Sequence, residues 1–549
     1  MHYLSLLVVR GCALLALLLP LCQISWAGNY VTESELRTGL DDALESELAS
    51  GIPEVSGEMW RDLNRFYDSR SGAPFWVATG GVERMGEQLA LLLIGASEHG
   101  LDNERYHAAQ LEQLLGSEDD QALARLELLL THGLLRFVVD LHSGRPEIDR
   151  KAQDWFIERT DIEPLDYLRR VSRGESLQSV LDELAPPHPR YRDLQIAHTH
   201  YQMIADDGGW PRLQAMVTLE RGKQHSDVSR LRRRLYLSGD LNGIDNSSNQ
   251  FDEALTQAVI RFQQRHGLKE DGVVGPRTRE VLNVPVELRM QQIRLNMERW
   301  RWMPRQLEEY HLQVNLADFS LQLIDDDRPQ FGMKVIIGKN YSETPAFSGT
   351  VRYLVANPFW HVPRRLAVEN LLPKQKQDKN YFTEKGIRVL QRAAFGSEEI
   401  DPAEVDWMEL SRNNFPYRLR QDPGVKNSLG RIKFIFPNEH AIYLHDTPAQ
   451  GLFEKGVRTF SGGCIRVAEP IKLASYLLGD EWSGEQVLDL IGEKETRRLN
   501  LSNRIPIYII YMTAWVDEQG VMQFRNDVYG RDQRLAQQLQ GLDKLYSDL

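Results

Sequence analysis

The chain has 549 residues and a formal net charge of -13, and 42% of its residues are hydrophobic. This acidic balance argues against a nucleic-acid partner, because phosphate binding needs clustered Lys and Arg. The length predicts about three domains rather than one.

The first 27 residues have the pattern of an export signal. Arg10 is their only charged residue, an apolar run covers Gly11–Leu21, and Ser25-Trp26-Ala27 supplies the small residues that a signal peptidase needs. We therefore expect residues 1–27 to be a signal peptide cleaved after Ala27, and the protein to reach the periplasm. The alternative is an uncleaved anchor, since Leu4–Val9 is apolar too, and only then would the chain contact a membrane.

The positions of the cysteines limit the possible roles of the thiol in the mature chain. The sequence holds Cys12, Cys22 and Cys464, and the first two lie in the predicted signal peptide. Exported proteins usually pair their cysteines, because their compartment is oxidising. One unpaired thiol there is open to oxidation, so Cys464 is either a working thiol or a buried, inert one. Composition alone leaves both interpretations open.

Residues 28–220 are predicted to be a helical scaffold domain. Glu83–Ser97 and Ala122–Leu141 carry apolar residues at helical spacing. Polar residues lie within or beside these stripes, and we expect them to be satisfied on a helix face rather than catalytic. They are His132, Arg136 and Asp140. The sequence does not indicate what this scaffold binds.

Residues 223–285 form a compact unit with three predicted helices. Val228, Leu231 and Leu235 form one apolar stripe, a second runs from Ala254 to Phe262, and Gly275-Pro276 starts the third helix. The segments "DVSRLRRRLYLSGDL" and "AVIRFQQRHGLKEDGVVGPRTREVLN" resemble the three-helix peptidoglycan-binding module found on many wall enzymes. The alternative is a module that has lost wall affinity and only packs.

Residues 307–515 are predicted to be a mostly β domain, followed by a C-terminal extension over 516–549. Alternating apolar and polar residues indicate half-buried strands. The predicted strands cover 310–324, 331–339, 351–357, 431–436, 440–444 and 506–512. A polar insertion over about 364–430 interrupts them, and we expect a lid with some helix around 368–372 and 401–410.

The segment "AIYLHDTPAQGLFEKGVRTFSGGCIRV" holds the candidate active site. Tyr443 and His445 are two apart on a predicted strand and face one side, whereas His440 faces the other. Residues 446–460 are long enough to bring the chain back beside that strand. Ser461, Gly462 and Gly463 then deliver Cys464 from a tight turn whose N–H groups can meet an oxyanion.

His445 is the expected base. It either forms an ion pair with the Cys464 thiolate or takes the proton as the thiol attacks. A third group must hold the imidazole, and three candidates stay open: Asp446, a backbone carbonyl of the Gly463 turn, and Ser461. Neighbours on a strand point apart, which makes the Asp446 carboxylate a poor candidate.

These residues resemble the catalytic signature of the L,D-transpeptidases. His445 comes first, and Ser461-Gly-Gly-Cys464, a hydrophobic residue and Arg466 follow it. Most members have a second histidine two before the cysteine and an asparagine two after it, where this chain has Gly462 and Arg466. A large subtype with a helical scaffold, a wall-binding module and a lid shows the same variant. Three further stretches resemble that subtype: "VANPFWHVP", "RQDPGVKNSLGRIKF" and "YMTAWVDEQGVMQFRNDVYGRD".

The resemblance implies a multidomain α+β protein and a two-step acyl transfer without metal or cofactor. Cys464 would attack the diaminopimelate carbonyl at position three of a tetrapeptide stem and expel the terminal D-alanine. The side-chain amine of a diaminopimelate on a neighbouring stem would resolve the thioester, giving a 3→3 cross-link. Tetrapeptide stems and glycan strands of peptidoglycan are the expected partners, and other wall synthases or carboxypeptidases are candidates. Carbapenems are expected to acylate Cys464.

The resemblance also assigns roles around the nucleophile. Backbone N–H groups of Gly463 and Cys464 would stabilise the oxyanion, and Tyr443 would line the pocket. Arg466 would either orient a stem carboxylate or form a salt bridge that holds the turn. Trp360 and His361 would line the donor groove, or only pack.

Four rival functions stay open. Water could resolve the thioester, which would make the protein an L,D-carboxypeptidase or another wall hydrolase. A cysteine endopeptidase usually places the cysteine before the histidine, the reverse of the order here. A zinc peptidase needs about three converging ligands, and His440 and His445 are expected to face opposite ways. The last rival is a non-catalytic wall adaptor.

Overall fold

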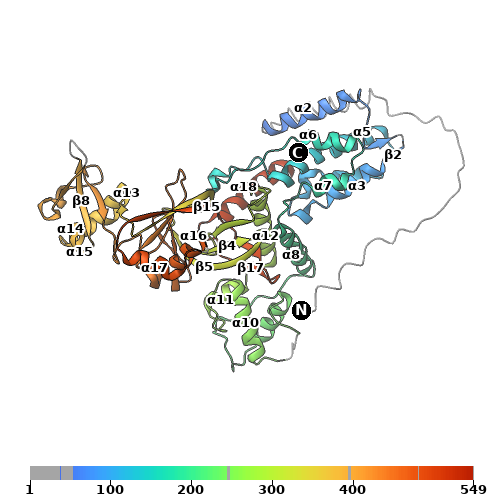
Figure 1. Cartoon of the computed structure of the whole chain (residues 1–549). Helices are drawn as coiled ribbons and strands as arrows, with labels where there is room; N and C mark the ends of the chain where they lie inside the picture. The colour runs from blue at the N-terminus through green and yellow to red at the C-terminus, as the bar shows by residue number, and fades with distance from the viewer. Residues whose placement is uncertain are drawn as a thin grey trace.

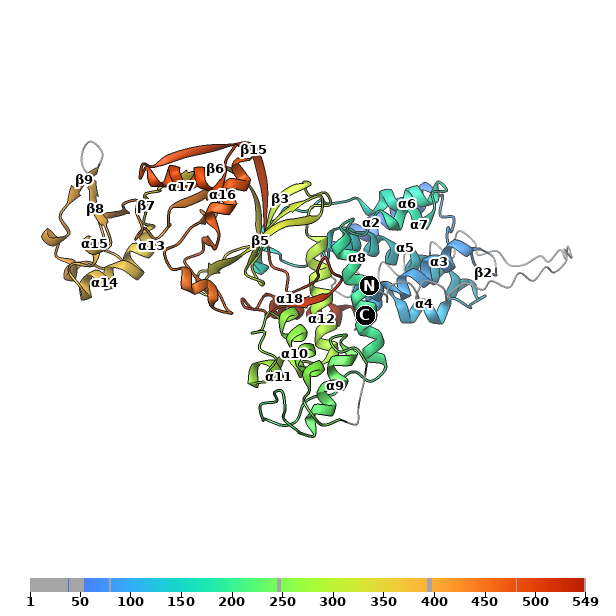
Figure 2. The ribbon, with the colours of Figure 1, turned by 60° about the horizontal axis from the view of Figure 1, so that its bottom comes forward.

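The computed structural model describes residues 38, 54–78, 80–243, 248–392, 397–479 and 481–547. The predicted signal peptide, with Cys12 and Cys22, lies outside these residues. A helical lobe and a small outer lobe lie at opposite ends of the molecule, and a β-sheet lobe lies between them with a three-helix module below it (Figure 1). The second view keeps this arrangement (Figure 2). The predicted multidomain α+β architecture is confirmed.

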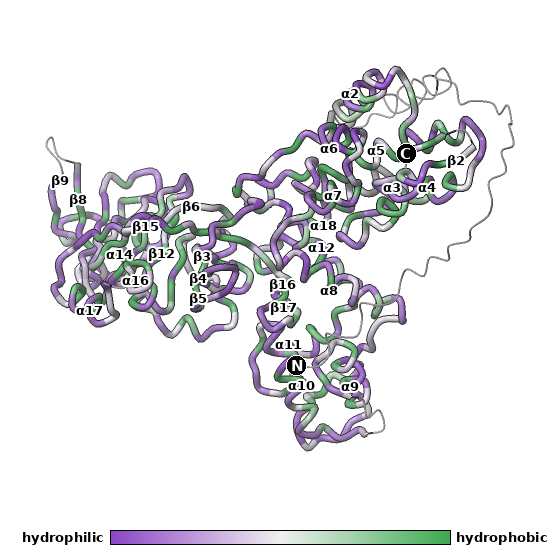
Figure 3. The backbone as a smooth tube through the Cα atoms, turned by 45° about the vertical axis from the view of Figure 1, so that its right-hand side comes forward, coloured by the Kyte–Doolittle hydropathy of each residue, from purple (hydrophilic) through white to green (hydrophobic). Residues whose placement is uncertain are grey.

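The described helices contain both hydrophobic and hydrophilic residues. Hydrophobic and hydrophilic residues alternate along most of the chain trace (Figure 3). In the part of the chain that the structure describes, no helix combines the length and the apolar character that crossing a membrane requires.

The helical scaffold surrounds one long buried helix. Its helices are α2 (Glu54–Ser69), α3 (Arg84–Ile94), α4 (Ala108–Leu114), α5 (Asp120–Ser143), α6 (Pro164–Ser172), α7 (Leu177–Asp182) and α8 (Pro189–Asp206). A short hairpin, β1 (Val77–Ala78) and β2 (Gly81–Val82), and the 3-10 turns η1 (Ala96–His99), η2 (Asn103–Tyr106) and η3 (Lys151–Gln153) complete it. Asp119 caps α5 by accepting from the Ala122 N–H.

Polar residues buried on α5 have partners inside the scaffold, as a satisfied helix face requires. Asp140 accepts from Arg105 at 2.5 Å and from the Tyr106 hydroxyl at 2.8 Å. The His132 ring contacts the His107 ring, with 2.8 Å between their nitrogens. These contacts give α5 a structural role.

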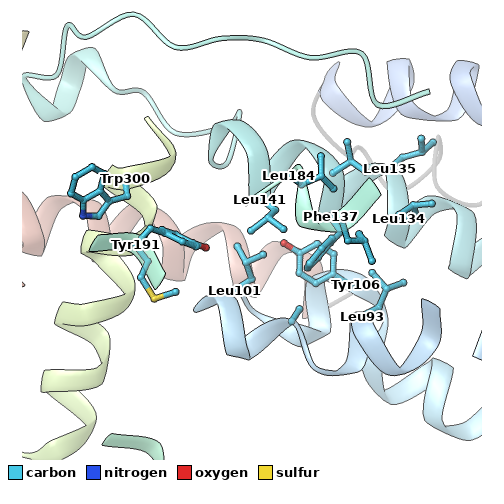
Figure 4. Close-up of a cluster of buried hydrophobic side chains, with 14 of the residues drawn as sticks. Leu93, Leu101, Tyr106, Leu134, Leu135, Phe137, Leu141, Leu184, Tyr191 and Trp300 are labelled. Carbon is cyan, nitrogen blue, oxygen red and sulfur yellow. The ribbon is translucent and has the colours of Figure 1, made fainter. Parts of the chain in front are cut away.

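Elements from the second half of the chain share the scaffold core. α12 (Val286–Arg301) packs on α8, and α18 (Arg531–Ser547) packs on α12. The hairpin β16 (Ala514–Val516) and β17 (Met522–Phe524) joins the same buried cluster. Tyr191 of α8 and Trp300 of α12 lie beside the scaffold leucines in Figure 4. Residues expected to form a C-terminal extension, such as Phe524 and Leu535, are therefore core residues.

The three-helix module has a core of its own. It consists of α9 (Asp227–Leu237), α10 (Glu253–Arg265) and α11 (Pro276–Leu282). Arg265 and Asp240 form a buried bidentate pair at 2.6 Å. The backbone carbonyl of Arg265 accepts from Arg525, and the His266 ring stacks on Phe524. The module is thus attached to the β16–β17 hairpin.

The β lobe is built on a nine-stranded sheet with the order β13-β5-β14-β12-β11-β6-β15-β3-β4. A further pairing of β4 with β5 closes it into a barrel-like structure. The strands are β3 (Tyr310–Asn315), β4 (Ser320–Asp325), β5 (Arg328–Gly338), β6 (Phe347–Ala356), β11 (Ile432–Ile435), β12 (Leu444–His445), β13 (Thr459–Ser461), β14 (Ile465–Val467) and β15 (Arg497–Ile510). Two helices, α16 (Pro470–Leu478) and α17 (Gly484–Gly492), pack against its core.

One predicted strand is mostly wrong. Residues 440–444 were expected to be extended, but only Leu444 and His445 form β12. His440 lies in a turn, and Ala441 has a φ of 54°, which ends extended structure. The His440 ring packs on Phe156 and Phe347 instead.

The insertion over about 364–430 contains helical turns near both expected positions, 368–372 and 401–410, and it also contains strands that were not expected. It has a four-stranded sheet in the order β7-β10-β8-β9 and its own hydrophobic cluster. Its strands are β7 (Trp360–His361), β8 (Ile387–Arg392), β9 (Ser397–Ile400) and β10 (Arg418–Gln421). Its helices and turns are α13 (Arg364–Leu366), η4 (Ala367–Leu371), α14 (Leu372–Gln377), α15 (Tyr381–Glu384), η5 (Pro402–Glu404) and η6 (Trp407–Glu409).

Candidate active site

Cys464 lies in the turn between β13 and β14. β14 pairs in parallel with β12, with Leu444 opposite Ile465 and His445 opposite Arg466. Leu444 and Ile465 are fully buried in the core of the sheet. Because side chains alternate between the two faces of a strand, Cys464 and Arg466 lie on the other face together with His445. The thiol and the imidazole therefore occupy diagonal positions on neighbouring strands.

Tyr443 belongs to the same group. Its ring centroid lies 5.7 Å from that of His445, and its backbone carbonyl accepts from the Ile465 N–H at 3.1 Å. The Cys464 sulfur lies 3.8 Å from the Ala441 carbonyl. Burial raises the pKa of the Cys464 thiol, although hydrogen bonds from Tyr443 and the charge of Arg466 oppose this rise. The thiol is thus predominantly protonated at neutral pH.

The His445 imidazole is buried and has backbone partners at Asp446 and Leu429. Its Nδ1 lies 2.5 Å from the backbone carbonyl of Asp446, so Nδ1–H is the donor. Burial, and then the charge of Arg466, lowers the pKa of His445 to about 3. The ring is therefore neutral at neutral pH. Within the described residues, no hydrogen bond joins this ring to the Cys464 sulfur, although both lie on one face.

The Asp446 backbone carbonyl holds the imidazole, whereas the three groups expected for this task have other partners. The Asp446 carboxylate accepts from the backbone N–H groups of Arg431 and Thr447. The Ser461 hydroxyl accepts from the Gly463 N–H at 3.1 Å. The Gly463 carbonyl accepts from the Thr344 hydroxyl at 2.8 Å. The Gly463 N–H, which was expected to donate to the oxyanion, therefore donates to Ser461 in this structure.

The two glycines of the turn satisfy different requirements. Gly463 has a φ of +122°, a conformation that side chains other than glycine rarely adopt. At Gly462 the backbone is permissive, but a Cβ there would lie 3.3 Å from Leu366 of the lid. Leu366 thus lies over the position at which most L,D-transpeptidases are expected to carry a second histidine.

The lid also contacts the turn through polar groups. The Gly462 carbonyl accepts from the Ser342 hydroxyl at 2.7 Å and from Arg365 at 3.2 Å. Arg365 also donates to the Ser342 hydroxyl at 2.8 Å. The turn that carries Cys464, the segment after β5 and the first lid helix therefore meet at the Gly462 carbonyl.

Arg466 lacks the salt bridge that was one of its two expected roles. Its Nε is buried without a hydrogen-bond partner, and no carboxylate of the described chain lies within ion-pair distance. Burial lowers the pKa of Arg466. The guanidinium therefore remains available for an anion.

The two expected groove residues have different environments. Trp360 is 9% exposed and belongs to the hydrophobic cluster of the lid. His361 is exposed on β7. Burial lowers the pKa of His361, as do the charges of Lys433 and Arg420. Trp360 thus packs inside the lid, and of the two only His361 is open to solvent.

Sequence reasoning missed four residues that contact or flank the site. Thr344 and Ser342 support the carbonyls of the turn, Arg365 reaches it from the lid, and Lys433 lies beside His445 across the sheet. Only Lys433 had a readable signal, a lysine alternating with apolar residues in "RIKFIF". The others depend on long-range contacts that no local pattern encodes.

In the described residues, no group of three or more His, Cys, Asp or Glu side chains is arranged to hold a metal ion. A cleft of about 1050 Å³ lies between the three-helix module and the β lobe. Its lining includes residues 453–458 of the segment that leads to β13, but not Cys464.

Three known families match parts of the chain. A scaffold domain matches residues 61–197, a domain described as "Putative peptidoglycan binding domain" matches 224–282, and the L,D-transpeptidase catalytic domain matches 309–494. The last match contains Cys464, His445, Arg466 and the lid.

A curated Haemophilus influenzae protein named "Putative L,D-transpeptidase" is 36% identical over 248 residues. The match covers 45% of this chain and 49% of that protein, so this chain spans about half the length of the relative. Solved L,D-transpeptidases include one from Xylanimonas cellulosilytica, with 15% identity, coverage of 54% of this chain and 99% of that chain, and a TM-score of 0.17. Another, from Stackebrandtia nassauensis, has 12% identity, coverage of 55% and 96%, and a TM-score of 0.22.

Proposed function

Because this chain belongs to the L,D-transpeptidase family through residues 309–494, we propose that it is a periplasmic acyltransferase that forms 3→3 cross-links in peptidoglycan. The observation that carries this proposal is the position of Cys464 and His445 on one face of the neighbouring strands β14 and β12. An acyl-transfer enzyme needs a nucleophile and a base within reach of one carbonyl.

In the first half-reaction, the Cys464 sulfur attacks the carbonyl of the third stem residue. A bond forms between sulfur and carbonyl carbon, and the thiol proton passes to His445. The amide bond to the terminal D-alanine then breaks, and its nitrogen takes that proton as the free amine leaves. The product is a thioester. The resting imidazole must turn toward the sulfur for this step, and catalytic hydrogen bonds commonly form only in the substrate complex.

In the second half-reaction, the side-chain amine of a neighbouring stem attacks the thioester carbon. A carbon–nitrogen bond forms, the carbon–sulfur bond breaks, and the amine's proton returns to the sulfur through His445. Neutral forms of both catalytic groups suit this cycle. Burial disfavours the charged form of each, which matches the directions of the pKa shifts of Cys464 and His445.

The turn supplies the expected oxyanion donors. Backbone N–H groups of Gly463 and Cys464 would meet the developing charge, and each such donor lowers the barrier by on the order of 3 kcal/mol. The Gly463 N–H would exchange its bond to Ser461 for the oxyanion. The hydrogen bonds from Ser342 to the Gly462 carbonyl and from Thr344 to the Gly463 carbonyl would keep the turn in place during this exchange.

Several features support peptidoglycan as the substrate. The three-helix module faces the β lobe across the large cleft, so a strand held by the module would run close to the segment before β13. The predicted signal peptide directs the chain to the compartment that holds this polymer. Other wall synthases or carboxypeptidases remain candidate partners.

The rival with the same site is hydrolysis of the thioester by water. A lid that covers the turn supports transfer, because excluding water protects a reactive intermediate. Incubating the protein with tetrapeptide stem dimers and weighing the products separates the two. Products containing only tripeptide stems would replace transpeptidation by carboxypeptidase activity.

The nucleophile is tested by the intact mass of the mature protein after mixing with a carbapenem. We expect one covalent adduct per chain, mapped to Cys464 by peptide analysis. The variant Cys464→Ala should show no adduct and no cross-linking. Cross-linking by that variant would remove Cys464 from the mechanism, and inactivity with every stem would remove the transpeptidase proposal.

A further inference from the structure

A row of three polar side chains crosses the sheet beside the nucleophile. Lys433 of β11 pairs directly with His445 of β12, and His445 pairs directly with Arg466 of β14. Directly paired residues of neighbouring strands face the same side of a sheet. Lys433 and Arg466 therefore flank the imidazole, one on each side.

Both flanking groups are cations without an acidic partner. No carboxylate of the described chain forms an ion pair with Lys433 or Arg466, and the Nε of Arg466 is buried without a partner. Burial lowers the pKa of both Lys433 and Arg466. Lys433 and Arg466 are both partly buried. Partly desolvated cations are usually paired, because removing a charge from water without a counterion is costly. Lys433 and Arg466 therefore have no carboxylate counterion among the described residues.

The two charges that lower the pKa of His445, those of Arg466 and Lys433, are both cationic. The charge of Lys433 acts on both His445 and His361 of the lid, and that of Arg420 also acts on His361. The acidic neighbour Asp446 is occupied with backbone N–H groups of Arg431 and Thr447. An acidic ligand would therefore meet two open cations in an overall acidic protein.

We propose that Lys433 and Arg466 form a two-cation subsite that binds two carboxylates of one acidic peptide stem, on either side of His445. This inference rests on the proposed function and adds its substrate specificity. Neighbouring strands are about 4.8 Å apart, so the backbones carrying the two cations are about 10 Å apart. That separation suits carboxylates on different residues of an extended stem, where each residue spans about 3.3–3.6 Å. Arg466, two residues from Cys464, takes the carboxylate nearer to the scissile carbonyl.

The test measures binding without chemistry, so that it is independent of the catalytic proposal. In the Cys464→Ala background, calorimetry compares a tetrapeptide stem with free carboxylates against stems in which one carboxylate at a time is amidated. Charge-assisted hydrogen bonds are about twice as strong as neutral ones. We expect at least one amidation to weaken binding about 10-fold or more. Equal affinity for all stems would overturn the subsite.

Variants then assign the carboxylates to the cations. Lys433→Gln should weaken the acidic stem about 10-fold and lose the preference for one particular carboxylate, whereas Lys433→Arg should keep it. Lys472→Gln, at an exposed lysine of α16, is the matched control and should bind like the parent. Unchanged preference in Lys433→Gln would overturn the role of Lys433.

Two further measurements distinguish misfolding of the variant from loss of the subsite. Circular dichroism and iodoacetamide labelling of Cys464, in chains that retain it, report whether Lys433→Gln folds with an intact turn. If that variant does not fold, amidation of the stem against the Cys464→Ala chain still decides the inference. Selective binding by a protein that forms no cross-links would overturn the proposed function and retain the subsite.

Discussion

Burial of both Cys464 and His445 has a direct consequence for the pH at which the thiol reacts. The pKa of the thiol is raised, and burial lowers the pKa of His445 to about 3. A thiolate–imidazolium pair needs the opposite shifts. The free protein therefore holds a neutral thiol beside a neutral ring between about pH 5 and 8.

We expect the alkylation rate of Cys464 by iodoacetamide to increase steadily with pH through and above the ordinary thiol pKa. The sign follows from the raised pKa, because a raised pKa leaves less thiolate at any given pH than free cysteine has. Mass spectrometry of timed samples from pH 5 to 10 measures the rate, with free cysteine as the reference. A rate plateau that extends down to pH 5 would show an ion pair instead.

Substitutions at the two glycines of the turn test backbone strain and steric contact separately. We expect Gly463→Ala to slow carbapenem acylation at least about 10-fold, because a φ of +122° costs a non-glycine residue about 1–3 kcal/mol. Gly462→Ala should have a much smaller effect, since its Cβ meets only the flexible end of Leu366 at 3.3 Å. Stopped acylation reactions followed by intact mass compare the two. Equal losses would mean that φ is not the requirement.

At the site, the sequence predicted residues that lie within one continuous segment. It did not predict residues from distant segments that reach the site only through the fold. Cys464, its glycines and His445 follow from spacing, since a short return segment brings two neighbouring strands together. The Asp446 carbonyl as the group holding the imidazole could not be predicted, because carbonyls carry no sequence signal. Lys433 was missed because its importance comes only from its register opposite His445.

Among the elements, alternation predicted strands where one face is buried and failed where the chain is polar. β3 to β6 lie close to their expected positions, because their apolar residues recur at every second position. β15 was expected over 506–512 but begins already at Arg497, in a mostly polar stretch. The lid strands β8 to β10 are rich in Arg, Gln and Glu, so the sequence predicted some helix in the insertion but no strand. Their sheet is stabilised by a cluster of distant residues such as Trp360, Phe382 and Trp407.

The first lid helix, α13, is the element that connects lid and turn. We expect Arg365→Ala to slow acylation of Cys464 about 10-fold, because it removes the bonds from Arg365 to the Gly462 carbonyl and the Ser342 hydroxyl. The thermal midpoint should hardly change, since Arg365 is exposed and exposed pairs contribute little to stability. Acylation kinetics and differential scanning fluorimetry measure the two effects.

Arg412→Ala is the matched control for Arg365→Ala. Arg412 is another exposed lid arginine that pairs with Glu369, but no contact joins it to the turn. Normal acylation by this variant, together with slow acylation by Arg365→Ala, assigns the effect to the turn. The link between lid and turn would be refuted if both variants acylate at the rate of the unchanged protein.

At the scale of the whole molecule, separate cores predict separate unfolding units. The scaffold, α12, the β16–β17 hairpin and α18 share one buried cluster, whereas the three-helix module has its own. Segments that share a core tend to unfold together, and segments with their own core can unfold alone. Because α18 shares the scaffold cluster, we expect this helix and the scaffold helices to unfold as one unit.

Leu535→Ala tests this coupling, because Leu535 is fully buried in the scaffold cluster although it lies near the end of the chain. We expect a loss of about 2–5 kcal/mol, the usual cost of removing a buried leucine side chain. Differential scanning calorimetry should show the scaffold transition shifted to lower temperature and the transition of the three-helix module unchanged. Leu488→Ala, at an exposed leucine of α17, should shift neither transition. If Leu535→Ala leaves the scaffold transition in place, α18 is not part of that unit, and the C-terminal residues would again be a separate extension.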